Sequence, residues 1–334
     1  HLFSPFRLDL FGDQAGFFVS SSMTTNQRIF LAAQPNYDEA ALAGKLHGLL
    51  EPATAGSNLR GTQVLLKPNL LTANNAQLAC TDARFLVAAA RWFLDQGAKV
   101  QVGDSPSFGS AEGVLRSMGA LDPLTAMGVR VAEFKMSRKL QLGNGIQAGL
   151  AQAALDCDLM VNLPKVKAHG QARVTLAVKN CFGCLSGFQK PWWHMRHGVP
   201  EKGIFFDLLV ALLAHLPPSL HLVDGITAMH KTGPVHGQPF PLGCIVCGAN
   251  PVAVDTVLLY ILGVPASQSP LWLAARKAGL AGTRLEELQL DHGLLNTLRV
   301  NGFRVPETLS PVRFNPLRFV KNNGKRLLLR LQGG

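Results

Sequence analysis

The stretch NLPKVKAHGQARVTLAVKNCFGCLSG, residues 162–187, carries an unusual pattern of positive charge. Lys165, Lys167 and His169 fall at every second position. Because side chains alternate between the two faces of a β-strand, an extended KVKAH segment places all three on one face. Like charges set side by side repel each other, so a purely structural strand rarely has this pattern. The stretch therefore predicts a strand that holds an anion.

Outward from this stretch, short apolar runs alternate along the chain with longer segments of helical period. Most of the runs are almost continuously apolar, as in strands that are covered on both faces. This alternation predicts an α/β fold, with a mostly parallel sheet and helices on both of its faces. The expected strands are residues 28–33, 62–67, 98–103, 129–134, 157–163, 219–224 and 242–248.

Two of the intervening segments have clear helix boundaries. Residues 82–97 begin with Asp82 as the expected N-cap, place Phe85 and Trp92 on one face, and end at Gly97. Residues 250–263 begin with an asparagine followed by proline, a favoured cap and first helical residue, and end at a glycine.

Composition restricts the class of protein. Of the 334 residues, 47% are hydrophobic and 16% charged, which is typical of a globular chain with a substantial core. The sequence has no uncharged apolar run of about 18 residues, the length expected of a transmembrane helix. Six cysteines do not suggest a disulfide scaffold, so we expect a cytoplasmic protein.

The formal net charge of +11 predicts an acidic partner. Candidate partners are a small phosphorylated or carboxylated molecule, an anionic membrane and nucleic acid. The positions of the positive charges must decide between them.

The chain divides into three parts on sequence grounds. Residues 1–22 read as an added leader or a loose extension before a natural start at Met23. Residues 23–310 form one large α/β domain, in which 264–310 read as a peripheral helical segment. Residues 311–334 hold six lysines and arginines and no acidic residue, which predicts a basic tail.

Polar residues gather where the predicted strands end. In an open α/β sheet, ligands bind outside the carboxyl ends of the strands, so these side chains are expected to share one site. Each strand end supplies part of a mixed lysine, aspartate and histidine set. We expect seven of these side chains to converge on one cleft: Lys67, Asp104, Lys165, Lys167, His169, Lys179 and Asp224. Asn69, Ser105, Thr175 and Asn180 are expected as further ligand-binding residues.

These residue types suit the binding and turnover of a small anion. The lysines neutralise carboxylate or phosphate oxygens, and a lysine crowded by other lysines can act as a nucleophile or base because its pKa falls. His169 is the best candidate for proton transfer, since its ordinary pKa lies nearest neutrality. Asp104 and Asp224 can orient a lysine, act as bases, or bind a divalent cation through oxygen. The sequence does not identify a cofactor.

The segment after KVKAH is expected to continue the site. Thr175 and Lys179 are four residues apart, which would place them on one helical face. The first N–H groups of that helix could hold an anion. The following residues, 188–203, are rich in aromatic and polar side chains and resemble a lid.

The chain also contains two CxxC pairs, Cys181 with Cys184 and Cys244 with Cys247. Such pairs can hold zinc or an iron–sulfur cluster. However, Cys244 and Cys247 fall in a predicted strand, where residues three apart point to opposite faces. We therefore expect no four-cysteine metal site.

Several motifs resemble, in order and spacing, a known family of uncharacterised proteins, the domain of unknown function 362 family. The resemblance covers roughly residues 60–265 and implies an α/β domain with a shared polar site, but no established reaction. The motifs are VLLKPNL (64–70), GAKVQVGDSP (97–106), VNLPKVKAHGQARVTLAVKNCFG (161–183), LVDGITAMHKTGPVHGQP (222–239) and NPVAVDTVLLYILG (250–263).

Many members of this family carry a ferredoxin-like insert or tail with closely spaced cysteines, and the printed sequence has none, so the resemblance does not imply electron transfer through a cluster. NLPKVKAH is also similar, over a short stretch, to the lactate racemase family, whose members use a nickel-pincer nucleotide.

Taken together, the pattern favours an uncharacterised enzyme that binds a small anionic substrate or cofactor. One alternative is a redox enzyme or isomerase with a metal or a tightly bound cofactor. Others are a nucleic-acid-binding protein and a membrane-peripheral protein held weakly by its basic tail. Specific nucleic-acid binding is disfavoured, because the motif lysines lie at strand ends and not along one helix or stripe.

Overall fold

The computed structural model describes residues 27–107, 109–142, 146–186, 193 and 204–310. Three of the sequence predictions fall on other residues. The leader at 1–22, the lid at 188–203 apart from Trp193, and the basic tail at 311–334 therefore lie outside the described residues.

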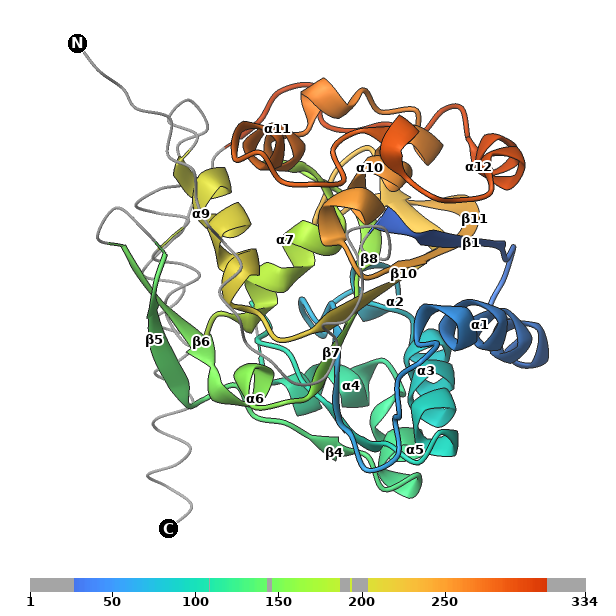
Figure 1. The fold of residues 1–334 in the computed structure, drawn as a ribbon, viewed down its shortest axis with the longest axis vertical. Coiled ribbons are helices and arrows are strands. Elements are labelled where there is room, and N and C mark those ends of the chain that lie inside the picture. Colours follow the sequence, from blue (N-terminus) through green and yellow to red (C-terminus); the bar gives the residue numbers. More distant parts are fainter. Residues whose placement is uncertain (1–26, 108, 143–145, 187–192, 194–203, 311–334) are drawn as a thin grey trace.

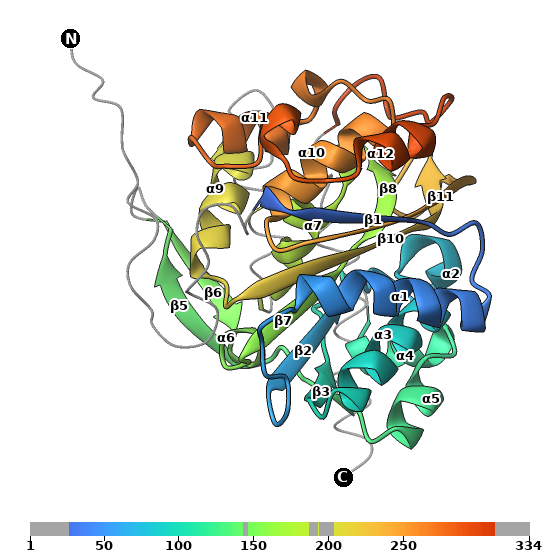
Figure 2. The same cartoon turned by 45° about the vertical axis from the view of Figure 1, so that its right-hand side comes forward.

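The core of the fold is a nine-stranded sheet, seven of whose strands follow the order β1-β11-β10-β7-β2-β3-β4 (Figures 1 and 2). β8 pairs with β10, and β9 pairs with β8. The pairs β10–β7, β7–β2, β2–β3, β3–β4 and β10–β8 are parallel, whereas β1–β11, β11–β10 and β8–β9 are antiparallel. The strands are β1 (Ile29–Ala33), β2 (Gln63–Pro68), β3 (Lys99–Val102), β4 (Arg130–Val131), β7 (Leu159–Leu163), β8 (Lys165–His169), β9 (Arg173–Thr175), β10 (Ser219–His230) and β11 (Gln238–Gly248).

The predicted mostly parallel α/β fold is confirmed, and a strand lies in each of the seven expected segments. The KVKAH segment is also a strand, β8. These predictions succeeded because a strand covered on both faces must be apolar at consecutive positions, which is a local signal. In β7, for example, all five residues are buried.

Helices cover both faces of the sheet, as the α/β pattern predicts. One core packs α1 and α3 against the strands through side chains such as Leu46 and Phe85. Two further cores on the other face hold α7, α9, α10 and α11. The longer helices are α1 (Glu39–Ala53), α3 (Ala83–Asp95), α4 (Ala111–Ser117), α5 (Leu121–Ala126), α7 (Ala177–Cys181), α9 (Ile204–Leu212), α10 (Pro251–Ile261), α11 (Pro270–Lys277) and α12 (His292–Leu298), and the single-turn helices are α2 (Ala76–Ala79) and α6 (Gln152–Leu155).

The predicted helix boundaries hold in α3 and α10. The Asp82 side chain accepts a hydrogen bond from the Arg84 N–H, and Asn250 accepts from the N–H groups of Val252 and Ala253. Both are the N-cap interactions that their sequence positions indicated. Beyond α3, Gly97 adopts a positive φ of 78°, a conformation that favours glycine.

The predicted end of the strand at residue 224 is wrong. β10 continues through Gly225 to His230, and β11 begins at Gln238, so the two strands form a long antiparallel hairpin. The register shifts between Gly225 and Thr227, which marks a β-bulge. Gly225 directly follows Asp224 in the sequence, and a glycine within a strand pattern can be taken for the end of the strand.

The region between β4 and β7 also differs from the expected alternation with helices. Residues 137–151 hold the antiparallel pair β5 (Ser137–Gln141) and β6 (Gln147–Ala151), which forms a separate two-stranded sheet. It projects from the left of the molecule in Figure 1. The Gly-Asn-Gly sequence between the strands is a hairpin signal that the helical interpretation overlooked.

The peripheral helical segment predicted for 264–310 is present as α11, α12 and two short 3-10 turns, Ala266–Gln268 and Leu285–Glu287. Figure 1 shows it above α10, on the side of β1 and β11. Among the described residues, no helix combines the length and apolarity that spanning a membrane requires.

The arrangement of β7 and β8 along β10 positions the lysines. β10 pairs first with β7, from Ser219 to His221. Beyond the end of β7, the same strand pairs with β8, so that Asp224 lies opposite Lys165 and Met229 opposite Lys167. The break at Pro164 thus brings a second strand to β10, with its charged face beside the carboxyl ends of β2 and β7.

Candidate functional site

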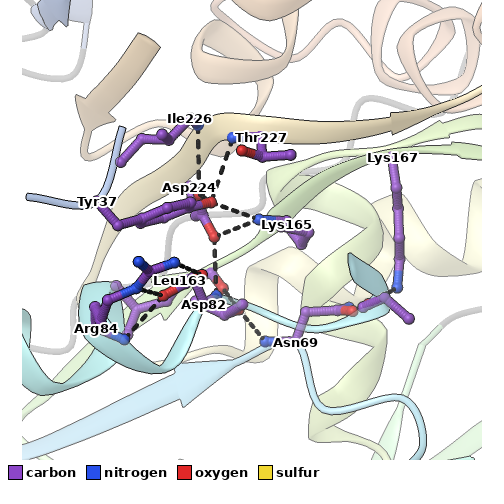
Figure 3. Close-up of polar contacts among 12 residues, drawn as sticks. Tyr37, Asn69, Asp82, Arg84, Leu163, Lys165, Lys167, Asp224, Ile226 and Thr227 are labelled. Carbon is purple, nitrogen blue, oxygen red and sulfur yellow. Dashed lines mark hydrogen bonds and ion pairs between the residues drawn. The ribbon is translucent and has the colours of Figure 1, made fainter. Parts of the chain in front are cut away.

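Lys165 and Asp224 form a buried ion pair at the center of the site (Figure 3). The Lys165 Nζ lies 2.8 Å from Asp224 Oδ2, and the two side chains are 1% and 0% exposed. Tyr37, from the loop before α1, completes the group: its hydroxyl accepts a hydrogen bond from Lys165 Nζ at 2.7 Å and donates to Asp224 Oδ1 at 2.7 Å. Burial and the Asp224 charge raise the pKa of Tyr37 far above its ordinary value, so the phenol stays protonated.

Residues at the start of α3 also contact Asp224 and Tyr37. The backbone N–H of Asp82 donates to Asp224 Oδ2 at 2.9 Å. The Arg84 guanidinium lies 4.5 Å from the center of the Tyr37 ring and pairs with the Asp82 carboxylate at 2.9 Å. Asp224 is therefore satisfied by an ammonium, a phenol and a backbone donor, as a buried carboxylate requires.

A second buried ion pair joins the ends of β2 and β3. Lys67 Nζ lies 2.9 Å from Asp104 Oδ1, and Asp104 Oδ2 accepts the backbone N–H of Leu70 at 2.8 Å. Burial alone would lower the pKa of Lys67, but Asp104 and the neighbouring thiols of Cys184 and Cys181 outweigh it and raise the pKa.

Gly183 packs against this second ion pair. A Cβ atom at Gly183 would lie well inside van der Waals contact with both Asp104 Oδ1 and Lys67 Nζ. The CFGC turn after α7 therefore packs its backbone directly on the ion pair, a close approach that only glycine permits.

In both pairs an aspartate contacts a lysine. Of the three expectations for Asp104 and Asp224, the orientation of a lysine is the one that the contacts show. Lys67 and Lys165 each have a carboxylate of their own chain within 3 Å. Neither lysine needs a ligand to neutralise its charge.

Lys167 differs from both of them. Its ammonium is 1% exposed and donates to two neutral oxygens, Asn69 Oδ1 and the carbonyl of Ala79, each at 2.6 Å. Among the described residues, no carboxylate lies within 4 Å of it. Burial lowers the pKa of Lys167 to about 8, and the charges of Lys165 and Lys67 act in the same direction. Figure 3 shows it apart from the Tyr37 group, with its amine beside Asn69.

A chain of side-chain amides holds the Lys167 acceptor in place. Asn69 Nδ2 donates to Asn180 Oδ1 at 2.6 Å, and Asn180 Nδ2 donates to Asn162 Oδ1 at 2.8 Å. Asn162 Nδ2 in turn lies 2.9 Å from His221 Nδ1. Burial lowers the pKa of His221 to about 3, so its ring is neutral. Because each amide orients the next, the Asn69 carbonyl oxygen faces Lys167.

The helical placement expected for Thr175 is wrong. Thr175 lies on β9, paired across from Lys167 on β8, and α7 begins only at Ala177. Val174 and Thr175 are β-branched and pack well on a pleated surface, which favours the extra strand. Residues directly opposite in an antiparallel pair point to the same face, so Thr175 still faces the side of Lys167. Its hydroxyl is buried and has no hydrogen-bond partner in the part of the chain that the structure describes.

The anion site expected at the start of the next helix is also wrong. The carboxylate of Asp255, on α10, accepts the N–H of Ala177 at 2.7 Å and of Val178 at 3.4 Å. An oxygen of the chain's own Asp255 side chain thus already occupies the first N–H groups of α7. Burial raises the pKa of Asp255 to about 8, while these backbone hydrogen bonds oppose the shift.

The other expected residues, Lys179, His169 and Ser105, have contacts of their own. The Lys179 ammonium lies 4.5 Å from the center of the Phe182 ring and 5.7 Å from that of Phe205. His169 Nδ1 accepts the N–H groups of Gln171 and Ala172 at 3.1 and 3.3 Å, so this ring nitrogen is engaged by the backbone. Ser105 follows Asp104 and is half-buried.

The cysteines are placed as the strand argument required. Cys244 belongs to the core on one face of the sheet and Cys247 to the core on the other. Cys181 and Cys184 lie in a third core. All six cysteines are free thiols.

Sequence reasoning missed four contributors to the site: Tyr37, Asp82, Gly183 and Asp255. Asp82 was assigned only as a helix cap, although its backbone N–H also reaches Asp224. Gly183 sits between the two cysteines of a CxxC motif, which drew attention to the thiols instead. Tyr37 is one of only two tyrosines and lies in a loop far from the motifs, so its position carried no signal.

Comparison with known proteins identifies the family. The sequence model described as "Domain of unknown function (DUF362)" matches residues 64–260, which is more than half of the chain. The chain belongs to this family. The resemblance noted from the motifs is confirmed, and the matched segment contains every residue of the site except Tyr37.

A curated relative in Synechocystis sp. is described as a thylakoid-associated protein. It is 34% identical over 307 residues, which cover 90% of this DUF362 chain and 95% of the relative.

Two solved structures are similar at low identity. The lactate racemase apoprotein from Thermoanaerobacterium thermosaccharolyticum has a TM-score of 0.40 and 14% identity over 62% of this chain. A protein from Thermotoga maritima has a TM-score of 0.42 and 11% identity over 63% of this chain. The chain spans about half the length of each, 53% and 55%.

Proposed function

We propose that this DUF362 protein is an enzyme that binds a small anionic molecule, a carboxylate or a phosphate, with Lys167 as the residue that receives the anion. One observation carries the proposal: Lys167 is a buried ammonium with no carboxylate partner among the described residues. Burying a charge costs free energy unless an opposite charge or sufficient hydrogen bonds compensate for it. Lys67 and Lys165 have such compensation within the chain, and Lys167 would obtain it from a ligand.

The same residue suits chemistry as well as binding. A group with a pKa near the working pH transfers protons most efficiently, and the pKa of Lys167 is about 8. In this proposal Lys167 binds the anion as an ammonium and can return a proton to it. His169 is proposed as the second proton-transfer group, with Lys179 and Ser105 as further ligand-binding residues. The reaction itself is not assigned.

The test compares Lys167→Met with wild type. Methionine keeps the length and apolar stem of lysine but removes the charge. Ligand-observed NMR with acetate and with inorganic phosphate measures the affinity of each full-length protein. The matched control is Lys45→Met, which removes an exposed lysine from α1 and the same unit of net charge. We expect Lys167→Met to lose binding of whichever anion the wild type binds, and Lys45→Met to keep it. Equal binding by all three proteins would refute the proposal.

Membrane association is a second candidate, favoured by the description of the Synechocystis relative as thylakoid-associated. We propose that the basic tail at 311–334 contacts anionic lipid, while the folded part remains on the cytoplasmic side, where its six thiols stay reduced. Cosedimentation with phosphatidylglycerol vesicles tests this proposal. We expect a chain ending at Ser310 to lose vesicle binding and to keep small-anion binding. DNA binding through the same tail should be unspecific and should fall steeply with salt.

A further inference from the structure

Lys167 and Thr175 are paired across β8 and β9, and each has a buried hydrogen-bond donor without a partner among the described residues. An ammonium has three N–H donors, and Lys167 uses two of them, on Asn69 and Ala79. Thr175 is 3% exposed, and its hydroxyl has no hydrogen-bond partner among the described residues. The two residues are paired across β8 and β9 and face the same side. A buried donor without an acceptor loses its hydrogen bonds to water and gains none in return, so these two residues favour a ligand with acceptor oxygens.

The charges around this position restrict which acceptor fits. The Lys67–Asp104 and Lys165–Asp224 pairs are each neutral, whereas Lys167 brings a positive charge to the Thr175 side that is not paired with a carboxylate of the described residues. The Asp104 carboxylate is also close enough to act on the Lys167 charge. A ligand with one negative charge is neutralised by Lys167. A dianion would bring a second, uncompensated charge into a buried site that already holds carboxylates, at a considerable cost.

We propose that the ligand of this site is a monocarboxylate, with one carboxylate oxygen bound by the Lys167 ammonium and Thr175 as the second donor. This inference rests on the proposed function and narrows it, since it excludes phosphate dianions. Thr175 is a binding and positioning residue in this scheme. It supplies a hydrogen bond but no charge, so it selects for an oxygen acceptor at a defined place, while Lys167 sets the charge that the site accepts.

The experiment measures the affinity of full-length protein for acetate, sulfate and acetamide by ligand-observed NMR at pH 7. Sulfate is a permanent dianion, and acetamide has the shape of acetate without its charge. The variants are Lys167→Met, Thr175→Val, which is close in shape but lacks the hydroxyl, and Thr175→Ser, which retains it. Thermal unfolding of each variant checks that it folds.

Under the proposal, wild type binds acetate at least tenfold more tightly than sulfate or acetamide, and Lys167→Met binds none of them. Thr175→Val weakens acetate binding roughly tenfold, as expected for one hydrogen bond to a charged acceptor, and Thr175→Ser restores it.

The other outcomes separate the two claims. Sulfate binding that exceeds acetate binding and disappears in Lys167→Met would overturn the monocarboxylate assignment and leave the proposed function standing. An unchanged acetate affinity in Thr175→Val would overturn the role of Thr175. If no anion binds, or if acetate binds equally to Lys167→Met, the proposed function and this inference both fail. Should Lys167→Met not fold, the Thr175 variants and the ratio of acetate to sulfate affinity in wild type still decide the inference.

Discussion

Lys165 Nζ and Asp224 Oδ2 are 2.8 Å apart in the interior, and Lys277 Nζ and Asp207 Oδ2 are also 2.8 Å apart at the surface. The two ion pairs have the same N–O distance, but the first is buried and the second is exposed to solvent. Their side chains are 1% and 0% exposed in the first pair, against 73% and 42% in the second. A surface pair contributes little because water and salt screen it, whereas breaking a buried pair leaves an uncompensated charge in the interior.

We therefore predict unequal effects of removing one partner. Lys165→Met should lower the free energy of unfolding by about 3–5 kcal/mol, because Asp224 loses its counter-charge. Asp224→Asn should have a similar effect, since it leaves the Lys165 ammonium unpaired. The double variant should cost clearly less than the sum, because neither charge then remains. Lys277→Met should change stability by at most about 1 kcal/mol.

Urea unfolding of the four variants and wild type, monitored by circular dichroism, measures these differences. Additive single effects at Lys165 and Asp224 would show that the two charges do not depend on each other. The buried ion pair between Lys165 and Asp224 would then be contradicted.

Gly183 offers a second test, because a methyl group there meets Lys67 and Asp104 directly. We predict that Gly183→Ala lowers the free energy of unfolding by about 2 kcal/mol or more, since overpacking a core usually costs about 1–3 kcal/mol and here an ion pair is displaced. The matched control is Gly48→Ala in α1, an exposed position with nothing within 4 Å of the new methyl group. Alanine is the better helix former, so this control should gain roughly 0.5–1 kcal/mol. A neutral Gly183→Ala would mean that the CFGC turn can move away from the ion pair.

The sequence was sufficient to locate the sheet and one edge of the site because those signals are local. A strand covered on both faces is apolar at nearly every position. In a parallel sheet the residues that follow such strands lie at the same edge, outside the carboxyl ends of the strands. Lys67, Asp104, Lys165 and Asp224 were identified in this way. Their pairing into two ion pairs follows from sheet order, which places β2 next to β3 and β8 next to β10.

The contacts that sequence reasoning missed depend on positions far apart in the chain. Tyr37 reaches Asp224 across 187 residues, and Asp255 reaches Ala177 across 78. Thr175 was assigned to a helix because its spacing to Lys179 fits one, yet pairing with β8 decided its conformation. Tertiary pairing overrides local preference in such cases, and no pattern within a short window reports it.

Asp255 gives a prediction with a definite pH dependence. Burial raises its pKa from 3.8 to about 8, so the native state holds the Asp255 proton more strongly than the unfolded state does. The resulting stabilisation is complete below about pH 4 and is lost as the pH rises through 8. Asparagine keeps the oxygen that accepts the Ala177 N–H but does not titrate. We predict that Asp255→Asn becomes progressively more stable than wild type between pH 5 and pH 8.8.

Urea unfolding at pH 5, 6.5, 8 and 8.8 tests this difference directly. The control is Asp122→Asn, which makes the same chemical change at an exposed position of α5. Its stability relative to wild type should vary much less over this range. A difference between Asp255→Asn and wild type that stays constant from pH 5 to pH 8.8 would contradict the assigned environment of Asp255.

The last prediction concerns the protonation of Lys167 during ligand binding. The pKa of Lys167 is lowered from 10.5 to about 8, so the free protein loses this positive charge just above neutral pH. Anion binding requires the ammonium. The affinity for acetate should therefore be nearly constant below pH 7.5 and should fall about tenfold per pH unit well above pH 8.

Arginine remains protonated throughout, because its pKa exceeds 12. A Lys167→Arg variant should thus bind acetate with little dependence on pH, although its larger head group will weaken the affinity at pH 7. Lys45→Met should reproduce the wild-type profile, since it removes a lysine outside the site. Acetate titrations of the three proteins from pH 6.5 to pH 9.5 distinguish the outcomes. A flat wild-type profile, or a fall above pH 8 that persists in Lys167→Arg, would show that the charge receiving the anion does not belong to Lys167.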